Sequence, residues 1–433
     1  MVKNRGLGML IEFSVANFRS IRERQVLSLT KSKLKESEDL KENSFSVNGL
    51  ANVDLLRSCA VYGANAAGKS NLLLALTEMV RVVEESATEM RRGDELPVQP
   101  FRLDTSTREA PSEFEVIFIS QGVRYQYGFT ALTERIVEEW LIAFPKGRAQ
   151  HWFARQWDEK KEEYQWQMGK SLLGQKHLWM ESTRSNALFL STAVQLNSQQ
   201  LLSVYDWFTD TLRMASVSSW NPGFTASICD RKEYKAKVMD FLQAADIDIN
   251  DVVIEKKVFD SKDLPDELPD EFRSQICKRL EGKEIVAELN VIHLDNEGDP
   301  VAFELDDESH GTRKLFSFAG PWLDTLENGY VLFIDELHDN LHPKLVRFLV
   351  QLFHSDKTNP NNAQLVFTTH ETSILSSDIL RRDQVWFCEK DSTRATQLFP
   401  LTDFHYRTRE NLEAAYLIGR FGAVPYIREL KRI

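Results

Sequence analysis

The chain has 433 residues, of which 42% are hydrophobic and 27% charged, with a formal net charge of −12. This composition is typical of a large globular protein and excludes a disordered chain, and the acidic balance disfavours a protein coated in nucleic acid. The longest apolar runs are too short to cross a bilayer, and four scattered cysteines indicate neither a disulfide framework nor a zinc site, so we expect a cytoplasmic protein without membrane association.

The first predicted elements are strands. Residues 11–15 alternate between apolar and polar side chains, residues 26–29 continue in the same style, and the polar residues 31–50 suggest a loop or an outlying hairpin. Residues 58–62 form a short apolar strand. An amphipathic helix through about Glu85 follows it.

The middle of the chain changes from strand to helix patterns. A turn at Gln121-Gly122 predicts a hairpin between two alternating segments. The predicted elements are strands over 113–140 that include this hairpin, further strands within 146–182, helices within 185–214 and 231–244, and an exposed acidic loop over about 255–285.

The last part alternates between helices and buried strands. We predict helices over 312–327 and 343–355, and strands over 330–334, 364–369 and 384–388. The fold class is therefore α/β, a nucleotide-binding fold interrupted by a largely helical insertion. The expected divisions are an N-terminal lobe (9–145), the insertion (146–300) and a C-terminal lobe (301–433).

A phosphate-binding loop lies between the strand at 58–62 and the helix after it. Its pattern G-x-x-x-x-G-K-S runs from Gly63 to Ser70. Glycines let successive backbone N–H groups face the phosphates, Lys69 reaches the β- and γ-phosphates, and the Ser70 hydroxyl binds Mg²⁺. The candidate nucleotide-binding residues are Gly63, Ala64, Asn65, Ala66, Ala67, Gly68, Lys69, Ser70 and Asn71.

Two adjacent acids end the strand at 330–334. Asp335 is a candidate Mg²⁺ residue and Glu336 a candidate general base for the attacking water. His370 closes the strand at 364–369, where a polar residue can sense the γ-phosphate.

A Ser-His-Gly-Thr segment, from Ser309 to Thr312, precedes the helix at 312–327. By itself it fits helix capping. ABC-type ATPases have a Ser-x-Gly signature at this place, and a resemblance to them implies that Ser309 and Gly311 bind the γ-phosphate held by a second copy, so that two chains sandwich two ATP molecules.

With these four motifs the chain resembles the ABC-type ATPases related to SMC and RecF proteins. It is more closely similar to the bacterial "AAA family" proteins of abortive-infection and anti-phage loci, such as the RloA-like proteins and the ATPase subunit of the PARIS system. The supporting strings cover about residues 9–427 and are Asn17-Phe18-Arg19-Ser20-Ile21, Pro100-Phe101-Arg102-Leu103, Glu139-Trp140-Leu141, Asp335-Glu336-Leu337-His338, Asp383-Gln384-Val385-Trp386-Phe387 and Gly419-Arg420-Phe421-Gly422-Ala423-Val424-Pro425.

The resemblance implies catalytic roles for Lys69, Glu336 and His370, with ATP and Mg²⁺ as cofactors. It also places Arg19 or Ser20 near the nucleotide and Gln99 near the metal. It implies a homodimer or higher oligomer that controls a separate effector, a nuclease or toxin, with nucleic acid or a phage protein as trigger. The signature lacks the second glycine of the Leu-Ser-Gly-Gly-Gln string, so we expect slow hydrolysis.

Other functions stay open. A DNA-repair or chromosome-maintenance ATPase is the main alternative, although no heptad run is long enough for a DNA-spanning coiled coil. A scaffold that binds ATP without useful hydrolysis is a third. His338 and His342 lie four residues apart, but Pro343 follows, so we do not expect a metal site there.

Overall fold

The computed structural model describes residues 8–47, 53–216, 222–264, 269–405 and 411–425. The chain divides into two compact units, which are described separately. The first comprises Met1–Val217, Thr325–Asp339 and Val346–Ile433, and the second Ser218–Asp324 and Asn340–Leu345. The divisions expected at 145/146 and 300/301 remain predictions.

Among the described residues, the strands are β1 Met9–Ala16, β2 Gln25–Ser28, β3 Ser44–Ser46, β4 Asp54–Leu56, β5 Ser58–Tyr62, β6 Ser112–Ser120, β7 Val123–Leu132, β8 Arg135–Phe144, β9 Gln150–Asp158, β10 Glu163–Met168, β11 Leu212–Ser216, β12 Asp251–Val258, β13 Glu284–Leu294, β14 Pro300–Glu304, β15 Val331–Asp335, β16 Gln364–Thr369, β17 Val385–Lys390 and β18 Thr396–Pro400. The α-helices are α1 Lys69–Glu85, α2 Lys176–Ser182, α3 Phe189–Gln195, α4 Gln199–Asp206, α5 Gly223–Ile228, α6 Lys232–Ala244, α7 Asp270–Leu280, α8 His310–Asn328, α9 Pro343–Phe353 and α10 Leu412–Leu417.

The first unit contains a large antiparallel sheet with the order β10-β9-β8-β7-β6-β1-β2. The predicted hairpin is confirmed as β6 and β7, joined at Gln121 and Gly122, which both have positive φ (50° and 76°). Such angles are typical of a type I′ turn, whose twist matches that of the strands. Strands β9 and β10 confirm the strands expected after residue 146.

A second sheet in this unit carries the motifs, with the order β11-β15-β16-β5-β17-β18. All its neighbouring pairs are parallel except β17 and β18. Strand β5 lies between β16 and β17, although β5 comes early in the chain and both of its neighbours come close to the end. The expected α/β architecture is confirmed.

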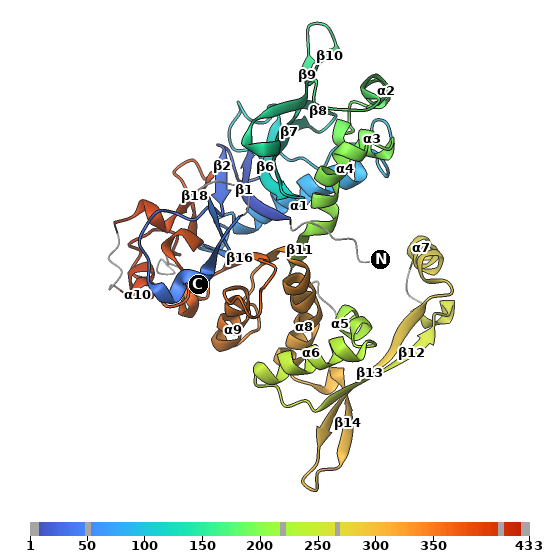
Figure 1. Cartoon of the computed structure of the whole chain (residues 1–433), viewed down its shortest axis with the longest axis vertical. Coiled ribbons are helices and arrows are strands. Elements are labelled where there is room, and N and C mark those ends of the chain that lie inside the picture. The colour runs from blue at the N-terminus through green and yellow to red at the C-terminus, as the bar shows by residue number, and fades with distance from the viewer. Residues whose placement is uncertain (1–7, 48–52, 217–221, 265–268, 406–410, 426–433) are drawn as a thin grey trace, which may run out of the picture. The chain divides into compact units, whose positions relative to one another are not determined.

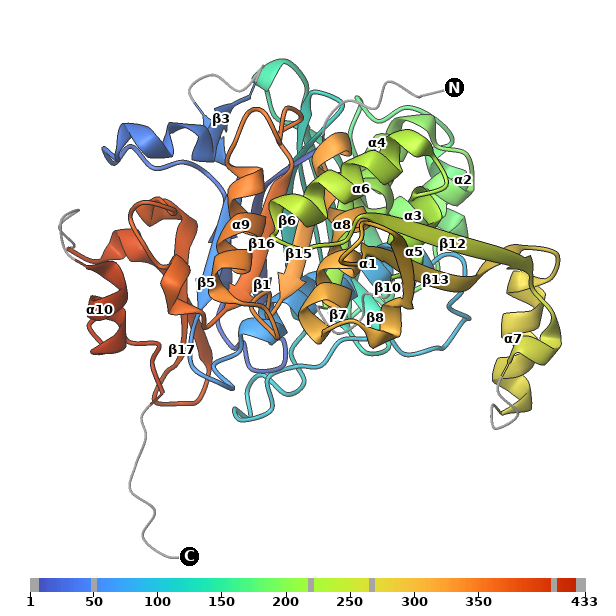
Figure 2. The ribbon, with the colours of Figure 1, turned by 90° about the horizontal axis from the view of Figure 1, so that it is seen from below.

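Helix α1 packs between the two sheets, against β1 and β6 on one side and β15 on the other (Figure 1). Its buried residues recur at helical spacing, as in Leu72, Leu76, Met79 and Val83. They join one hydrophobic core with residues of both sheets, so the loop that precedes α1 is fixed from both sides. The turned view shows β5, β16 and β15 of the second sheet side by side (Figure 2).

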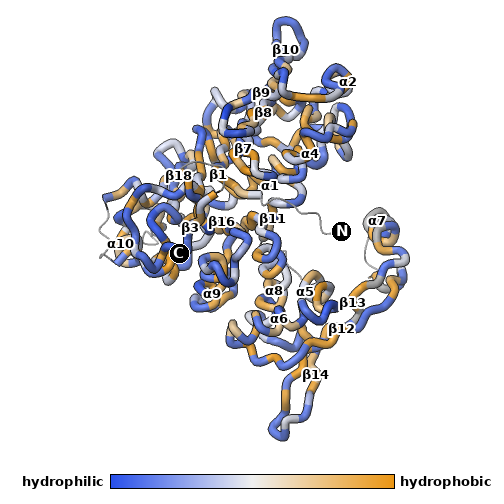
Figure 3. Tube along the Cα trace, in the orientation of Figure 1, coloured by the Kyte–Doolittle hydropathy of each residue, from blue (hydrophilic) through white to orange (hydrophobic). Residues whose placement is uncertain are grey.

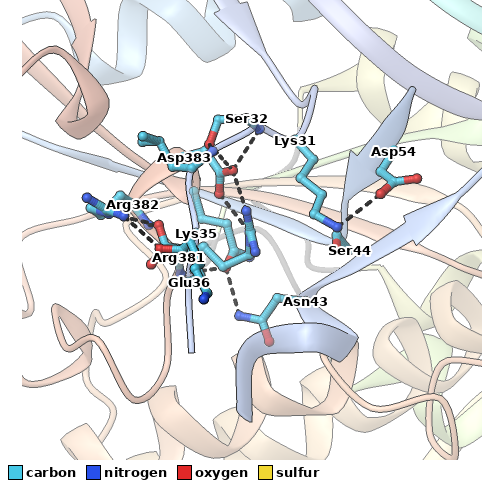
Figure 4. A network of polar contacts seen from close by, with 12 residues as sticks. Lys31, Ser32, Lys35, Glu36, Asn43, Ser44, Asp54, Arg381, Arg382 and Asp383 are labelled. Carbon is cyan, nitrogen blue, oxygen red and sulfur yellow. Dashed lines mark hydrogen bonds and ion pairs between the residues drawn. The ribbon is translucent and has the colours of Figure 1, made fainter. Parts of the chain in front are cut away.

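A polar network ties the residues after β2 to the residues just before β17 (Figure 4). The backbone N–H and hydroxyl of Ser32 both donate to Asp383 at 2.8 Å, and Arg381 also pairs with Asp383 at 2.7 Å. Arg382 pairs with Glu36 at 2.8 Å. These contacts join distant parts of the sequence and hold β17 beside β5.

The second unit contains the three-stranded antiparallel sheet β12-β13-β14 together with α5, α6 and most of α8. Thr225 of α5 bonds to α8, because its hydroxyl accepts a hydrogen bond from the Gly320 N–H at 3.0 Å. Residues 295–299, at the tip of the β13–β14 hairpin, are hydrophilic (Figure 3).

Two expectations about secondary structure were wrong. The helical pattern assigned through Met214 ends earlier, because residues 212–216 form β11 and pair with β15 of the parallel sheet. The segment expected to be an acidic loop over 255–285 contains the end of β12, helix α7 and the start of β13. Pairing of β12 with β13 outweighs the local acidic and proline signals.

Candidate nucleotide-binding site

Four parallel strands end at the same edge of the second sheet. The carboxyl end of β5 leads into the loop at 63–68, β15 ends at Asp335, β16 ends just before His370, and β17 ends at Lys390. Parallel strands of α/β folds place their ligands at this edge. Residues that are far apart in the sequence are therefore brought to one site.

The loop between β5 and α1 requires glycine at two positions. A Cβ on Gly63 would lie 2.4 Å from the carbonyl oxygen of Cys388. Gly68 has a φ of +112°, and a Cβ there would lie 2.1 Å from Thr396 Oγ1. Only glycine fits this close approach to the β17–β18 hairpin.

A cavity of about 460 Å³ lies over this loop. Its lining residues are Ser20, Asn65, Ala66, Ala67, Gly68, Lys69, Ser70, Asn71, Glu336, His370 and Lys390. The first backbone N–H groups of α1 have no acceptor within the helix, and the positive end of the helix dipole lies at the same place. Both features favour the binding of an anion in the cavity.

Lys69 is only 6% exposed. Its ammonium group donates hydrogen bonds to the carbonyl oxygens of Gly63 at 2.7 Å and Ala64 at 3.2 Å. Burial lowers the pKa of Lys69, and the nearby carboxylates of Glu336 and Asp335 act in the opposite direction. The cation is thus held within the loop, with acids of β15 close enough to influence it.

A threonine orders the two acids at the end of β15. The Thr368 hydroxyl of β16 donates to Asp335 Oδ1 at 2.5 Å and accepts the backbone N–H of Glu336 at 2.8 Å. Glu336 has a φ of +53°, an uncommon value for a residue with a side chain. The Glu336 side chain is exposed and lines the cavity, while Asp335 is not among its lining residues.

His370 lines the same cavity and packs against a second histidine. The rings of His370 and His338 have centroids 3.8 Å apart, with an interplanar angle of 61°. Thr369 Oγ1 and His338 Nδ1 are 3.1 Å apart in a hydrogen bond. Burial lowers the pKa of His338 to about 4, and the neighbouring His370 adds to this effect.

A chain of hydroxyl and amide contacts closes one side of the cavity. Asn71 Nδ2 donates to Ser20 Oγ at 2.7 Å, and Ser20 Oγ lies 2.8 Å from Thr396 Oγ1. The Thr396 hydroxyl also donates to the Ala67 carbonyl at 2.8 Å. The turn after β1 and the strand β18 thereby brace the phosphate loop.

Arg19 and Gln99 do not line the cavity over the phosphate loop. They line an adjoining cavity of about 330 Å³. The two are linked by their backbones, because the Arg19 N–H donates to the Gln99 carbonyl at 2.7 Å. Contact of Arg19 with a nucleotide and of Gln99 with a metal remain predictions.

Ser309 and Gly311 belong to the second unit, at the start of α8. The exposed Ser309 accepts the Thr312 N–H at 3.2 Å, which is a helix-capping hydrogen bond. A Cβ on Gly311 would meet only Ser309 Oγ, at 3.8 Å. The expected contact with ATP of a second chain remains a prediction.

Sequence reasoning missed Lys390, Thr368 and Thr396. A signal existed for Lys390, because it closes a strand that is parallel to β5 and so lies at the ligand edge of the sheet. Thr368 and Thr396 gave no local signal, since their partners at the site lie on other strands and loops that are distant in the sequence.

The described residues contain no group of three or more His, Cys, Asp or Glu side chains that could hold a metal by themselves. Mg²⁺ usually binds one or two protein oxygens together with substrate phosphates and water. The Ser70 hydroxyl and the Asp335 carboxylate, which both belong to the ligand edge of the parallel sheet, have the oxygen chemistry that this requires.

A family model described as "AAA domain, putative AbiEii toxin, Type IV TA system" matches residues 59–376. This span includes the phosphate loop, both acids and His370. The chain belongs to this AAA-domain family. No curated protein matches the chain in sequence.

Several solved structures are similar to this AAA-domain protein at low identity. The SMC head domain from Thermotoga maritima has 10% identity over 90% of this chain and 98% of its own, with a TM-score of 0.40. The RecF–ATP structure of the RecFOR pathway has 14% identity over 84% and 93%, with a TM-score of 0.31. The cbiO1 structure from Clostridium perfringens has 8% identity over 95% and 92%, with a TM-score of 0.32.

The fold of the chain is α/β, and its phosphate loop lies on a mostly parallel sheet in the unit that also holds a large antiparallel sheet. Within the residues that the structure describes, no helix combines the length and hydrophobicity needed to cross a membrane.

Proposed function

We propose that this chain hydrolyses ATP and uses the nucleotide state as a switch. One observation carries the proposal: a single cavity is lined by the phosphate loop with Lys69 and Ser70, by Glu336 and by His370. A loop that only capped a helix would not need an acid and a histidine from two other strands.

The residues have distinct roles in this mechanism. The loop N–H groups and Lys69 hold the β- and γ-phosphates, and Glu336 accepts a proton from the water that attacks the γ-phosphorus. His370 donates a hydrogen bond to the γ-phosphate. Ser70 and Asp335 would hold Mg²⁺, which neutralises charge that develops on the phosphate oxygens.

We infer that the complete site needs two chains. The capped start of α8 presents Ser309 and an unhindered Gly311, which are suited to meet the γ-phosphate bound by a partner copy. ATP would then hold a homodimer together, and hydrolysis would release it.

We further propose a regulatory role in an anti-phage or abortive-infection system, in which the ATP-bound dimer controls a separate toxin or nuclease. The toxin–antitoxin description of the matching family supports this proposal. A nucleic acid or a phage protein would be the trigger.

The ATPase proposal is tested with two substitutions. Lys69→Ala should abolish binding of ATP, measured by isothermal titration calorimetry. Glu336→Gln should retain binding but lower phosphate release by about 10²–10⁴-fold, because it removes the general base. Unchanged phosphate release in both variants would contradict the proposed site.

The regulatory role is tested in cells. The chain expressed alone should leave growth unaffected, and protection against phage should require both the chain and a second protein. Growth arrest by the chain alone would instead make it the toxin, and full protection by Lys69→Ala would exclude a nucleotide switch.

A further inference from the structure

The cavity beside the phosphate loop has an unusual lining. It measures about 330 Å³ and combines four cations with two amides and no carboxylate. Its polar lining residues are Arg19, Ser20, Asn71, Gln99, Arg102, Lys390 and Arg394. They come from the turn after β1, from the start of α1, from the segment after Val98 and from the β17–β18 hairpin.

The four cations of this lining lack a counterion in the part of the chain that the structure describes. Within the described residues, none of the Arg19, Arg102, Lys390 and Arg394 side chains forms an ion pair or donates a hydrogen bond. Arg19 Nε is buried without a hydrogen-bond partner among those residues. Its guanidinium lies 5.8 Å from the centroid of the Phe18 ring.

Carboxylates near this cavity are engaged elsewhere. Asp104 pairs with Arg22 at 3.5 Å. Asp391 accepts hydrogen bonds within its own hairpin, including the Thr393 N–H at 2.8 Å. Glu78 attracts Arg19, but it pairs with Arg81 at 3.8 Å and does not line the cavity.

Cations that converge without a counterion repel one another, and an anion removes this cost. Guanidinium groups form paired hydrogen bonds with phosphate oxygens, and the Ser20, Asn71 and Gln99 side chains can donate further hydrogen bonds. Phosphate is therefore the chemistry that this lining fits.

We propose that this second cavity binds a phosphate-bearing anion in addition to the nucleotide on the phosphate loop. Arg19 and Gln99, which the family resemblance places near the nucleotide and the metal, would then face this anion instead. The site goes beyond the proposed ATPase activity and provides a route to regulate it. Ser20, Asn71 and Lys390 line both cavities, so binding at one alters the surroundings of the other. Such coupling is reciprocal: the anion changes nucleotide affinity by the same factor as the nucleotide changes anion affinity.

The test uses full-length protein saturated with Mg²⁺ and a non-hydrolysable ATP analogue, so that the phosphate loop is occupied. Sodium tripolyphosphate and a short single-stranded oligodeoxynucleotide are then titrated separately by calorimetry. At least one of them should bind at one further site. Tripolyphosphate alone would indicate a free phosphorylated ligand, and the oligonucleotide alone a nucleic acid strand.

The combined change Arg102→Gln and Arg394→Gln should weaken this second binding at least tenfold and leave the analogue affinity unchanged. A matched control, Arg92→Gln with Arg148→Gln, removes two exposed charges outside the cavity and should change neither. If both double variants weakened binding of the second anion equally, overall charge would explain the effect and the proposal would be overturned.

Two further results would overturn it. One is that neither anion binds once the analogue is bound. The other is that the cavity variant loses analogue binding, which would mean that these cations bind the nucleotide itself. Lys69→Ala separates the two proposals, because it should lose the analogue and still bind the second anion. If wild-type protein binds no analogue, the ATPase proposal fails, and titration of the unliganded protein still tests the second site.

Discussion

His338 lies beside the candidate site and contacts His370, although it is not among the lining residues of the cavity. Its ring packs against the ring that lines the cavity, and its Nδ1 is hydrogen-bonded to Thr369, the residue before His370. His338 also follows the proposed base Glu336 by two residues. It therefore connects the acids of β15 to the histidine after β16.

We predict that His338→Ala lowers phosphate release about tenfold and leaves ATP affinity nearly unchanged, because His370 loses the ring that orients it. Single-turnover kinetics and calorimetry would separate the two effects. His342→Asn is the matched control, since this nearby histidine is exposed and Asn can keep its hydrogen bond to the Lys344 N–H. Loss of affinity in His338→Ala, or equal loss of turnover in the control, would contradict a positioning role.

We predict that a buried histidine, His354, makes the fold sensitive to acid. His354 is buried, its Nε2 lies 2.7 Å from Ser58 Oγ, and burial lowers its pKa to about 3. The unfolded chain binds this proton near pH 6.5. Stability should therefore be fully present above pH 6.5 and fall as the pH drops towards 3, by up to about 1.4 kcal/mol per pH unit.

Urea unfolding at pH 5 and pH 7.5 measures this dependence. His354→Gln should reduce the acid sensitivity, whereas the exposed His177→Gln should not. An unchanged slope in His354→Gln would assign the sensitivity to other groups.

At the scale of elements, a buried ion pair joins the antiparallel sheet to helix α3. Glu139 of β8 and Arg155 of β9 have side chains with 0% exposure and are 2.9 Å apart. Glu139 also accepts the N–H groups of Phe189 at 2.7 Å and Leu190 at 3.0 Å, at the start of α3. The Glu139-Trp140-Leu141 string, which supported the family resemblance, thus has a structural role.

We predict that Glu139→Gln lowers the free energy of unfolding by about 3–5 kcal/mol, because Arg155 keeps a buried charge without its partner. Arg81→Ala breaks an exposed pair with Glu85 and should cost less than about 1 kcal/mol. Chemical denaturation of the two variants makes the comparison, and similar losses would show that the buried pair is dispensable.

The sequence predicts an element well when nearby residues determine it, and poorly when contacts with distant segments determine it. The phosphate loop and the strands β5, β15 and β16 were predicted because glycine spacing and apolar runs are local signals. Strand β11 was missed because only its pairing with β15 makes it a strand. The bracing of the loop by Thr396 was missed for the same reason, since that contact joins the early part of the chain to its last strand.

At the scale of the whole molecule, the proposed trans site makes a quantitative prediction. Lys69→Ala and Ser309→Arg chains should each be inactive alone. Mixed in equal amounts, they should recover up to about half of wild-type phosphate release, because ATP then holds together only dimers with one chain of each kind, which contain one intact site out of two. A mixture without activity would contradict an active site shared between chains.

The position of β5 in its sheet also has a consequence for biosynthesis. Both strands that flank it, β16 and β17, leave the ribosome long after it does. Until then the nascent chain carries a strand whose five residues are all buried in the finished fold, with two open edges, so wrong pairing and binding of chaperones are favoured. The proposed nucleotide site therefore cannot form until β16 and β17 have both left the ribosome, so a shorter nascent chain would not act as the proposed switch.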